Sequence, residues 1–223
     1  MVNLSVGIIR KEVKTMKIIK PYAEIVDDIN GQDILQKIEK CGRVCYKSEG
    51  KICDGSAEKF VANIIKRGHE AVLEHVSITV KFVVDRGVSH EIVRHRIASY
   101  CQESTRYCNY IKEDFGSEIT FIMPYYLEGS VAYAPWRDAM WQCENTYFKL
   151  LDIGLTPQEA RAVLPHSLKT EVVMTANLRE WRTFFKLRTP QAAHPQMREV
   201  TRPLLDRFKQ LIPVVFDDIV YEE

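Results

Sequence analysis

The stretch RHRIASYCQESTRY, residues 94–107, limits the folds open to this chain more than any other segment. It carries three arginines, Arg94, Arg96 and Arg106, together with His95 and three serine or threonine hydroxyls. A buried arginine costs several kcal/mol unless it is paired, so this stretch cannot simply enter a hydrophobic core. The sequence therefore predicts an anion-binding site around residues 94–107.

The overall charge separates this site from a general polyanion-binding surface. The 223 residues include 31 lysines and arginines against 30 acidic residues, a net charge of +1. A nucleic-acid-binding module would be expected to carry a basic excess. No apolar run reaches the roughly 18–20 residues that cross a membrane, and no signal-peptide core precedes the domain. We expect a cytoplasmic protein with neither a nucleic-acid nor a membrane partner.

The six cysteines do not form a metal-binding motif. No CxxC pair occurs, and in a cytoplasmic chain reduced thiols are the default. His69 and His75 lack the HExxH spacing that places two imidazoles on one helical face. We therefore expect no metal site. Cys41 and Cys45, four residues apart in a helical pattern, are expected to face the core.

The hydrophobic pattern predicts one α+β domain with more helix than strand. Ile78, Val80, Phe82 and Val84 alternate with other positions, of which Ser77, Thr79 and Lys81 are polar, which is typical of a half-buried strand. Residues 1–15 are expected to be an extension that precedes a single domain over 16–223. The expected strands are 17–26, 77–84, 119–124 and 168–176, with a helix as the alternative for the last of these. The expected helices are 31–45, 56–68, one through 92–93, 130–152, 157–165, 178–188 and 196–212.

Three helix starts carry capping signals. Ser56 is a favourable N-cap residue, and Thr156-Pro157-Gln158-Glu159 is a capping box with proline at the first helical position. Asn177 precedes Glu180 by three residues and is a further capping candidate.

The residue chemistry alone leaves several functions open. Arginine binds phosphate or carboxylate through two parallel hydrogen bonds, which favours a phosphorylated ligand. Ser104 or Cys101, with His95 and Glu103 nearby, could instead serve a nucleophilic mechanism, although triad members are usually distant in sequence. The alternatives are a nucleotide phosphohydrolase and a nucleic-acid-binding module.

Four segments resemble one enzyme family. RHR-x7-S at 94–104 matches the signature of the flavin-dependent thymidylate synthases. HEAVLEH at 69–75, ARAVLPHSLKTEVVMTANLREW at 160–181 and FFKLRTPQAAHPQMRE at 184–199 are also similar to that family. The resemblance spans roughly residues 16–212.

The resemblance implies a fold, a reaction and an assembly. The fold is an α+β domain with helices around a small, mostly antiparallel sheet. The reaction is the reductive methylation of dUMP to dTMP, with carbon from 5,10-methylenetetrahydrofolate and hydride from NADPH through FAD. The assembly is a homotetramer whose active sites are shared between subunits.

The resemblance also implies site residues. Arg188, beside the uracil ring, is the implied catalytic residue. The implied cofactor-binding residues are His69, Ala71, Glu74, Arg94, His95, Arg96, Gln102, Asn177, Arg179, Thr183 and His194. The implied substrate-binding residues are Glu91, Arg94, Gln102, Glu103, Ser104, Thr105, Arg106, Arg161 and Arg188. The chain departs from the commoner motif by having Cys101-Gln102 in place of Asn-Glu, so an amide replaces a carboxylate.

Overall fold

The computed structural model describes residues 16–106 and 118–222, so the extension expected at 1–15 lies outside the described residues. The strands are β1 (Lys17–Ile19), β2 (Tyr22–Ile25), β3 (Ser77–Asp85), β4 (Ala98–Gln102), β5 (Thr120–Ile122) and β6 (Lys169–Asn177). The α-helices are α1 (Gly31–Val44), α2 (Ser56–Lys66), α3 (Arg86–Ile92), α4 (Tyr133–Asp152), α5 (Pro157–Ala160), α6 (Leu178–Arg188) and α7 (Pro195–Leu211). Short 3₁₀ helices are η1 (Glu49–Lys51), η2 (Glu70–His75), η4 (Tyr125–Leu127) and η5 (Arg161–Val163).

A four-stranded antiparallel sheet with the order β2-β3-β6-β4 forms the centre of the molecule. The alternation predicted for β3 is confirmed, since Ile78, Val80 and Phe82 are buried on one face while Thr79 and Lys81 are half-buried on the other. The mixed α+β fold with a small, mostly antiparallel sheet is likewise confirmed.

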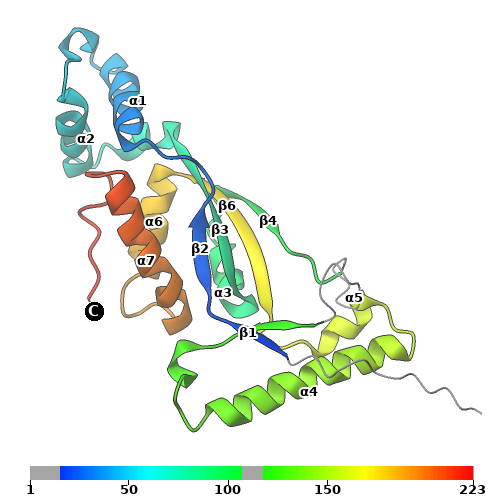
Figure 1. Cartoon of the computed structure of the whole chain (residues 1–223). Helices are drawn as coiled ribbons and strands as arrows, with labels where there is room; N and C mark the ends of the chain where they lie inside the picture. Colours follow the sequence, from blue (N-terminus) through cyan, green and yellow to red (C-terminus); the bar gives the residue numbers. More distant parts are fainter. Residues whose placement is uncertain (1–15, 107–117, 223) are drawn as a thin grey trace, which may run out of the picture.

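Helices α6 and α7 lie side by side next to this sheet (Figure 1). The aromatic stripe of α6 enters the core, where Trp181 and Phe184 pack against Phe82 of β3 at centroid distances of 6.3 and 5.9 Å. Trp181 Nε1 donates to the carbonyl oxygen of Ile78 at 3.0 Å, so its polar atom is satisfied inside the core. This packing fixes α6 against the strand that precedes the arginine-rich stretch.

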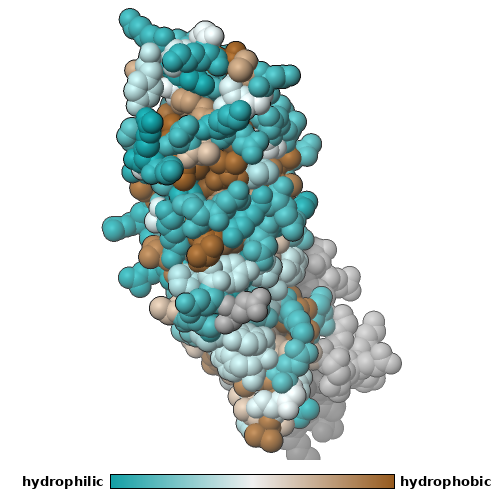
Figure 2. All heavy atoms as spheres, turned by 90° about the vertical axis from the view of Figure 1, so that its left-hand side faces the viewer, coloured by the Kyte–Doolittle hydropathy of each residue, from teal (hydrophilic) through white to brown (hydrophobic). Residues whose placement is uncertain are grey.

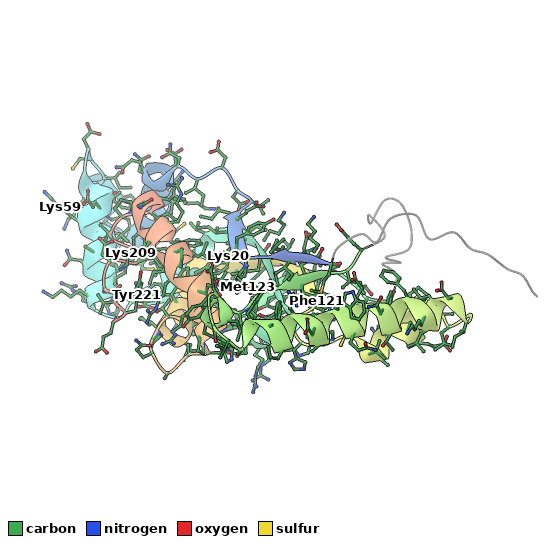
Figure 3. The ribbon with its side chains drawn as sticks, turned by 60° about the horizontal axis from the view of Figure 1, so that its bottom comes forward. Lys20, Lys59, Phe121, Met123, Lys209 and Tyr221 are labelled. Atoms are coloured by element: carbon green, nitrogen blue, oxygen red, sulfur yellow. The ribbon has the colours of Figure 1, made fainter. Side chains whose placement is uncertain are left out.

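A second hydrophobic cluster lies where the parallel pair β1–β5 meets the long helix α4. Phe121 of β5 lies over α4 in Figure 3, and it shares the cluster with Met140 and Tyr147 of that helix. The side of the molecule that lies to the left in Figure 1 is shown in Figure 2, and it is mainly hydrophilic with hydrophobic patches between the hydrophilic side chains.

Several sequence predictions need correction. The strand expected at 17–26 is divided into β1 and β2, which pair with different partners, because Pro21 cannot donate to a continuous ladder. Strand β4 was not predicted at all. The helix expected at 157–165 is a single turn, α5, followed by η5.

Two local predictions are also wrong. Ser56 is not an N-cap but the first residue of α2, and its hydroxyl donates to the buried carboxylate of Glu39 at 2.8 Å. Both cysteines were expected to face the core. Cys45 is instead exposed, and Cys41 is only half-buried. The capping predictions for Thr156 and Asn177 are confirmed.

Candidate active site

Arg188, at the last turn of α6, lies at the centre of a hydrogen-bonded cluster. Its Nε atom donates to Nε2 of His95 at 3.1 Å. Its Nη1 atom donates to the Glu91 carboxylate at 2.6 Å, and its Nη2 atom donates to the Glu91 carbonyl oxygen at 3.1 Å. Arginine has five N–H donors, so two remain for a ligand. The structure thus brings together three residues that the sequence implicated.

His95 is held from both sides of its ring. It is only 6% exposed, its Nδ1 atom lies 3.0 Å from Glu180, and the Phe184 ring contacts it edge-on at 4.9 Å. Burial lowers the pKa of His95, and the positive charge of Arg188 lowers it further, while the carboxylate of Glu180 opposes both effects. Burial also raises the pKa of Tyr100 to about 12, and its hydroxyl donates to the His95 carbonyl oxygen at 2.6 Å. The RHR segment is therefore fixed by its middle residue.

The two arginines that flank His95 point into solvent. Arg94 and Arg96 are exposed, and within residues 16–106 and 118–222 neither forms an ion pair. Two adjacent guanidinium groups with free donors fit the diphosphate of a dinucleotide.

Six further cofactor candidates lie just before β3 and in the first turns of α6. Glu74 and Arg179 form an exposed ion pair of 2.6 Å that joins η2 to α6. Asn177 caps α6 by accepting from the Glu180 amide at 2.9 Å. His69, Ala71 and Thr183 are exposed in the same two segments. These residues and RHR share one end of the sheet, because Ser77 pairs with Asn177 and Ala98 with the adjacent Ala176.

The substrate candidates Gln102 to Arg106 lie at the other end of β4, in its last residue and in the loop that follows it. Gln102 Nε2 donates to the hydroxyls of Ser89 and Thr170 at 3.0 and 3.4 Å. The amide that replaces the family's carboxylate is therefore hydrogen-bonded within the chain. Glu103 pairs with Lys169 at 3.0 Å. Four residue steps of β4 place this loop about 13 Å from Ala98. The arginine-rich stretch is therefore divided by a strand into two separate binding regions.

A cationic cavity of about 260 Å³ adjoins this loop. Its polar lining consists of Arg86, His90, Thr105, Arg161 and His166. Arg161 Nη1 donates to the buried hydroxyl of Thr105 at 3.1 Å. Ser104 accepts from the backbone N–H of Arg106 at 3.3 Å. The cavity suits a small anion such as a phosphate group.

His194, like Gln102, is a cofactor candidate that lies apart from those at the start of α6. It caps α7, where its Nδ1 atom accepts from the Gln196 amide at 3.3 Å, and Gln196 in turn binds Asp85 at the end of β3. Asp85 pairs with Lys169, at the opposite end of the sheet from Ser77 and Asn177. One chain therefore does not bring His194 to the cofactor candidates near Ser77 and Asn177.

Four residues of the site were not predicted from the sequence. Arg86, His90 and His166 line the cavity, and Glu180 binds His95. Arg86 and His90 lie at least 76 positions before His166 in the chain. Only the fold therefore shows that the three residues are close together. Glu180 was noticed only as part of a capping pattern. In the described part of the chain no group of three or more metal-ligating side chains occurs, and no helix is both long and apolar enough for a membrane crossing.

Known proteins that match this chain in sequence belong to one family. The family model described as thymidylate synthase complementing protein matches residues 25–214. A flavin-dependent thymidylate synthase from Geobacter sulfurreducens is 35% identical over 188 residues, which cover 79% of this chain and 78% of that protein. The chain belongs to the flavin-dependent thymidylate synthase family. The enzyme of the same name from Pyrococcus furiosus is 34% identical and covers 74% of this chain and 68% of its own length.

The structural comparison supports the same fold. A crystal structure of the UMP/dUMP methylase PolB from Streptomyces cacaoi, bound with 5-Br dUMP, superimposes with a TM-score of 0.74. The match covers 91% of this chain and 96% of that chain at 23% identity. As a member of the flavin-dependent thymidylate synthase family, the chain is an enzyme of the methyltransferase class that uses a flavin.

Proposed function

We propose that this chain catalyses the reductive methylation of dUMP to dTMP. The observation that carries the proposal is the Arg188 cluster. His95 and Glu91 hold the guanidinium with two N–H donors left over, close to the end of α3 that leads into RHR. A planar cation held in this way is suited to the carbonyl oxygens of a uracil ring.

The nucleotide phosphate is assigned to the cationic cavity. Arg161 and the buried Thr105 hydroxyl supply donors from one wall, and Arg86 and His166 supply further polar groups. Ser104 and Arg106 are the chain neighbours of Thr105 in the loop after β4 and are proposed as further donors. Near neutral pH a phosphate monoester carries between one and two negative charges, which this donor set would balance.

FAD is assigned to the exposed residues at the other end of β4. Arg94 and Arg96 would bind its diphosphate, and Glu74, Asn177, Arg179 and Thr183 would bind the remainder of the dinucleotide. When bound, FAD supplies the transfer of reducing equivalents. NADPH as the reductant and 5,10-methylenetetrahydrofolate as the carbon donor are part of the same proposal.

The proposed assembly is a homotetramer with shared active sites, working in the cytoplasm. His194 and the phosphate cavity lie at one end of the sheet, whereas most cofactor candidates lie at the other end. A neighbouring subunit would supply the residues that one chain keeps apart. This arrangement supports a site built from more than one chain.

In the proposed mechanism the protein places the substrate and stabilises charge. The Arg188 guanidinium donates to the uracil ring and stabilises the negative charge that develops on it, which polarises C5–C6. Glu91 fixes the plane of that guanidinium. Ser104 binds phosphate and is not a nucleophile in this scheme. The protein therefore contributes no covalent bond to the nucleotide.

The product assay tests this function against its rivals. The purified chain is incubated with FAD, dUMP, 5,10-methylenetetrahydrofolate and NADPH, and each component is omitted in turn. We expect dTMP only in the complete mixture. Release of inorganic phosphate from dUMP would favour a phosphohydrolase, and strong, salt-dependent DNA binding without dTMP would favour a nucleic-acid-binding module.

A further inference from the structure

Glu180 is a buried carboxylate whose side chain is not among the site residues implied by the family resemblance. It lies in the first turn of α6, is 7% exposed, and directs Oε1 to Nδ1 of His95 at 3.0 Å. A buried carboxylate destabilises the folded protein unless it is hydrogen-bonded or paired, so Glu180 is expected to have a specific partner. In the described residues that side-chain partner is His95.

Glu180, Phe184 and Arg188 form a single stripe along α6, because each is four residues from the next. His95 lies along this stripe. Its two ring nitrogens bind Glu180 and Arg188, and Phe184 contacts the ring edge-on between them. The imidazole thus connects a carboxylate at the start of the helix to a guanidinium at its end.

The partners of His95 determine its tautomer. A guanidinium has only donors, so Nε2, which faces Arg188 Nε at 3.1 Å, must be an acceptor. The ring proton is therefore on Nδ1, where it is donated to Glu180. A proton on Nε2 would set two donors against each other and would release Arg188 from one of its three bonds.

We propose that Glu180 is a positioning residue for the reaction, acting through His95 on Arg188. By accepting the Nδ1 proton it holds His95 as a neutral acceptor, and so keeps the two unbound N–H groups of Arg188 in one orientation. The inference rests on the proposed role of Arg188 in dUMP methylation. The same stripe also predicts a pH limit, because protonation of His95 breaks the contact with Arg188.

The charged and titratable groups around His95 come from three elements, α6, β4 and α3. Glu180 and Arg188 come from α6, and Tyr100 of β4 donates to the His95 carbonyl oxygen. Glu91 of α3 reaches His95 only through Arg188. Among these groups, Glu180 is the one whose charge directly favours the imidazolium form.

The test compares Glu180→Gln, Glu180→Ala and wild type as FAD-loaded enzymes. The kcat for dTMP formation is measured between pH 5 and 8, together with the KM for dUMP and the thermal midpoint. In Glu180→Ala we expect kcat to fall about tenfold to a hundredfold, as for other residues that orient an active-site ligand. In Glu180→Gln the amide oxygen can still accept from Nδ1, so we expect most of that loss to be recovered.

The pH profile separates positioning from simple stabilisation. Without the carboxylate charge, the imidazolium of His95 is less favoured, so the acidic limb of kcat in Glu180→Gln is expected to move to lower pH. Glu39→Gln is the matched control, because Glu39 is also buried but binds Arg43 and Ser56. We expect that variant to lower the thermal midpoint and leave the acidic limb in place.

An acidic limb that is the same in Glu180→Gln, Glu39→Gln and wild type would overturn the role of Glu180, even if Glu180→Ala failed to fold. A Glu180→Ala enzyme with wild-type kcat would also overturn it. Absence of dTMP formation in wild type would instead overturn the proposed reaction, and the role of Glu180 with it.

Discussion

Nε of Arg188 lies 3.1 Å from Nε2 of His95, and this contact joins residues that are 93 positions apart in the chain. The bond connects the RHR segment after α3 to the last turn of α6. It also explains why His95 is buried while the arginines on both sides of it are exposed. Within RHR, the histidine has a structural contact inside the chain, and the arginines are available for a ligand.

Replacing Arg188 tests the proposed centre of the site. Arg188→Ala removes the guanidinium that would stabilise charge on the uracil, so we expect kcat to fall at least about a hundredfold. FAD binding, measured by flavin absorbance after gel filtration, is expected to persist, because the proposed diphosphate ligands are Arg94 and Arg96. Turnover near the wild-type value would show that the assigned role is wrong.

Replacing Arg161 tests the phosphate cavity. Arg161→Ala removes a charged donor beside Thr105, and we expect the Kd for dUMP to rise about tenfold to a hundredfold. Arg207→Ala is the control, because Arg207 is an exposed arginine on α7 whose side chain binds Gln210. Equal dUMP affinity in both variants, measured by calorimetry, would remove Arg161 from the phosphate site.

Ser104→Ala distinguishes a phosphate ligand from a nucleophile. As a phosphate donor, Ser104 would contribute one hydrogen bond, so we expect dUMP to bind several-fold more weakly while chemistry continues. Steady-state kinetics at saturating dUMP give the relevant kcat. Complete loss of turnover with intact dUMP affinity would support the nucleophilic alternative.

Arg182 provides a test of stability that is independent of catalysis. It is 1% exposed, and its guanidinium binds Glu70, Asp218 and the Val215 carbonyl oxygen, thereby tying η2 and the C-terminal segment to α6. Arg182→Met leaves both carboxylates without this partner, and we expect the free energy of unfolding to fall by about 3 kcal/mol. Denaturant unfolding at fixed protein concentration measures it, and an unchanged midpoint would contradict the packing described here.

Glu199 on α7 predicts a pH-dependent change in stability. Burial raises the pKa of Glu199 to about 7, and in the described part of the chain its Oε2 atom has no hydrogen-bond partner. The folded protein therefore keeps a proton that the unfolded chain releases, and the free energy of unfolding falls as pH rises from about 4.5 through 7. Because the side chain is partly solvated, we expect Glu199→Gln to be more stable than wild type by only about 1 kcal/mol at pH 8. Equal stability is expected at pH 4, and a gain that did not depend on pH would contradict this account.

Local patterns in the sequence were sufficient for most of the fold. The apolar periodicity of Trp181, Phe184 and Phe185 predicted α6, and Asn177 marked its start. Strand β4 was missed because it is short, lies at the edge of the sheet, and alternates the half-buried Ala98 and Tyr100 with exposed polar residues. In isolation that pattern is indistinguishable from a polar loop.

The site was only partly predictable for a different reason. Residue types and the family resemblance indicated Arg188 and Arg161, but neither could show that His95 would bridge Glu180 and Arg188. The same holds for Arg86 and His166, which meet only when β3 and β6 pair. These contacts depend on tertiary packing, and no local periodicity encodes them.

Transfer of an isotopic label tests the central claim most directly. The FAD-loaded enzyme is given dUMP, NADPH and 5,10-methylenetetrahydrofolate labelled in its methylene carbon, and the nucleotide product is analysed by mass spectrometry. We predict dTMP with the label in its methyl group, and strongly reduced product from Arg188→Ala. Recovery of unlabelled dUMP from an enzyme that has bound both FAD and dUMP would contradict the proposed function.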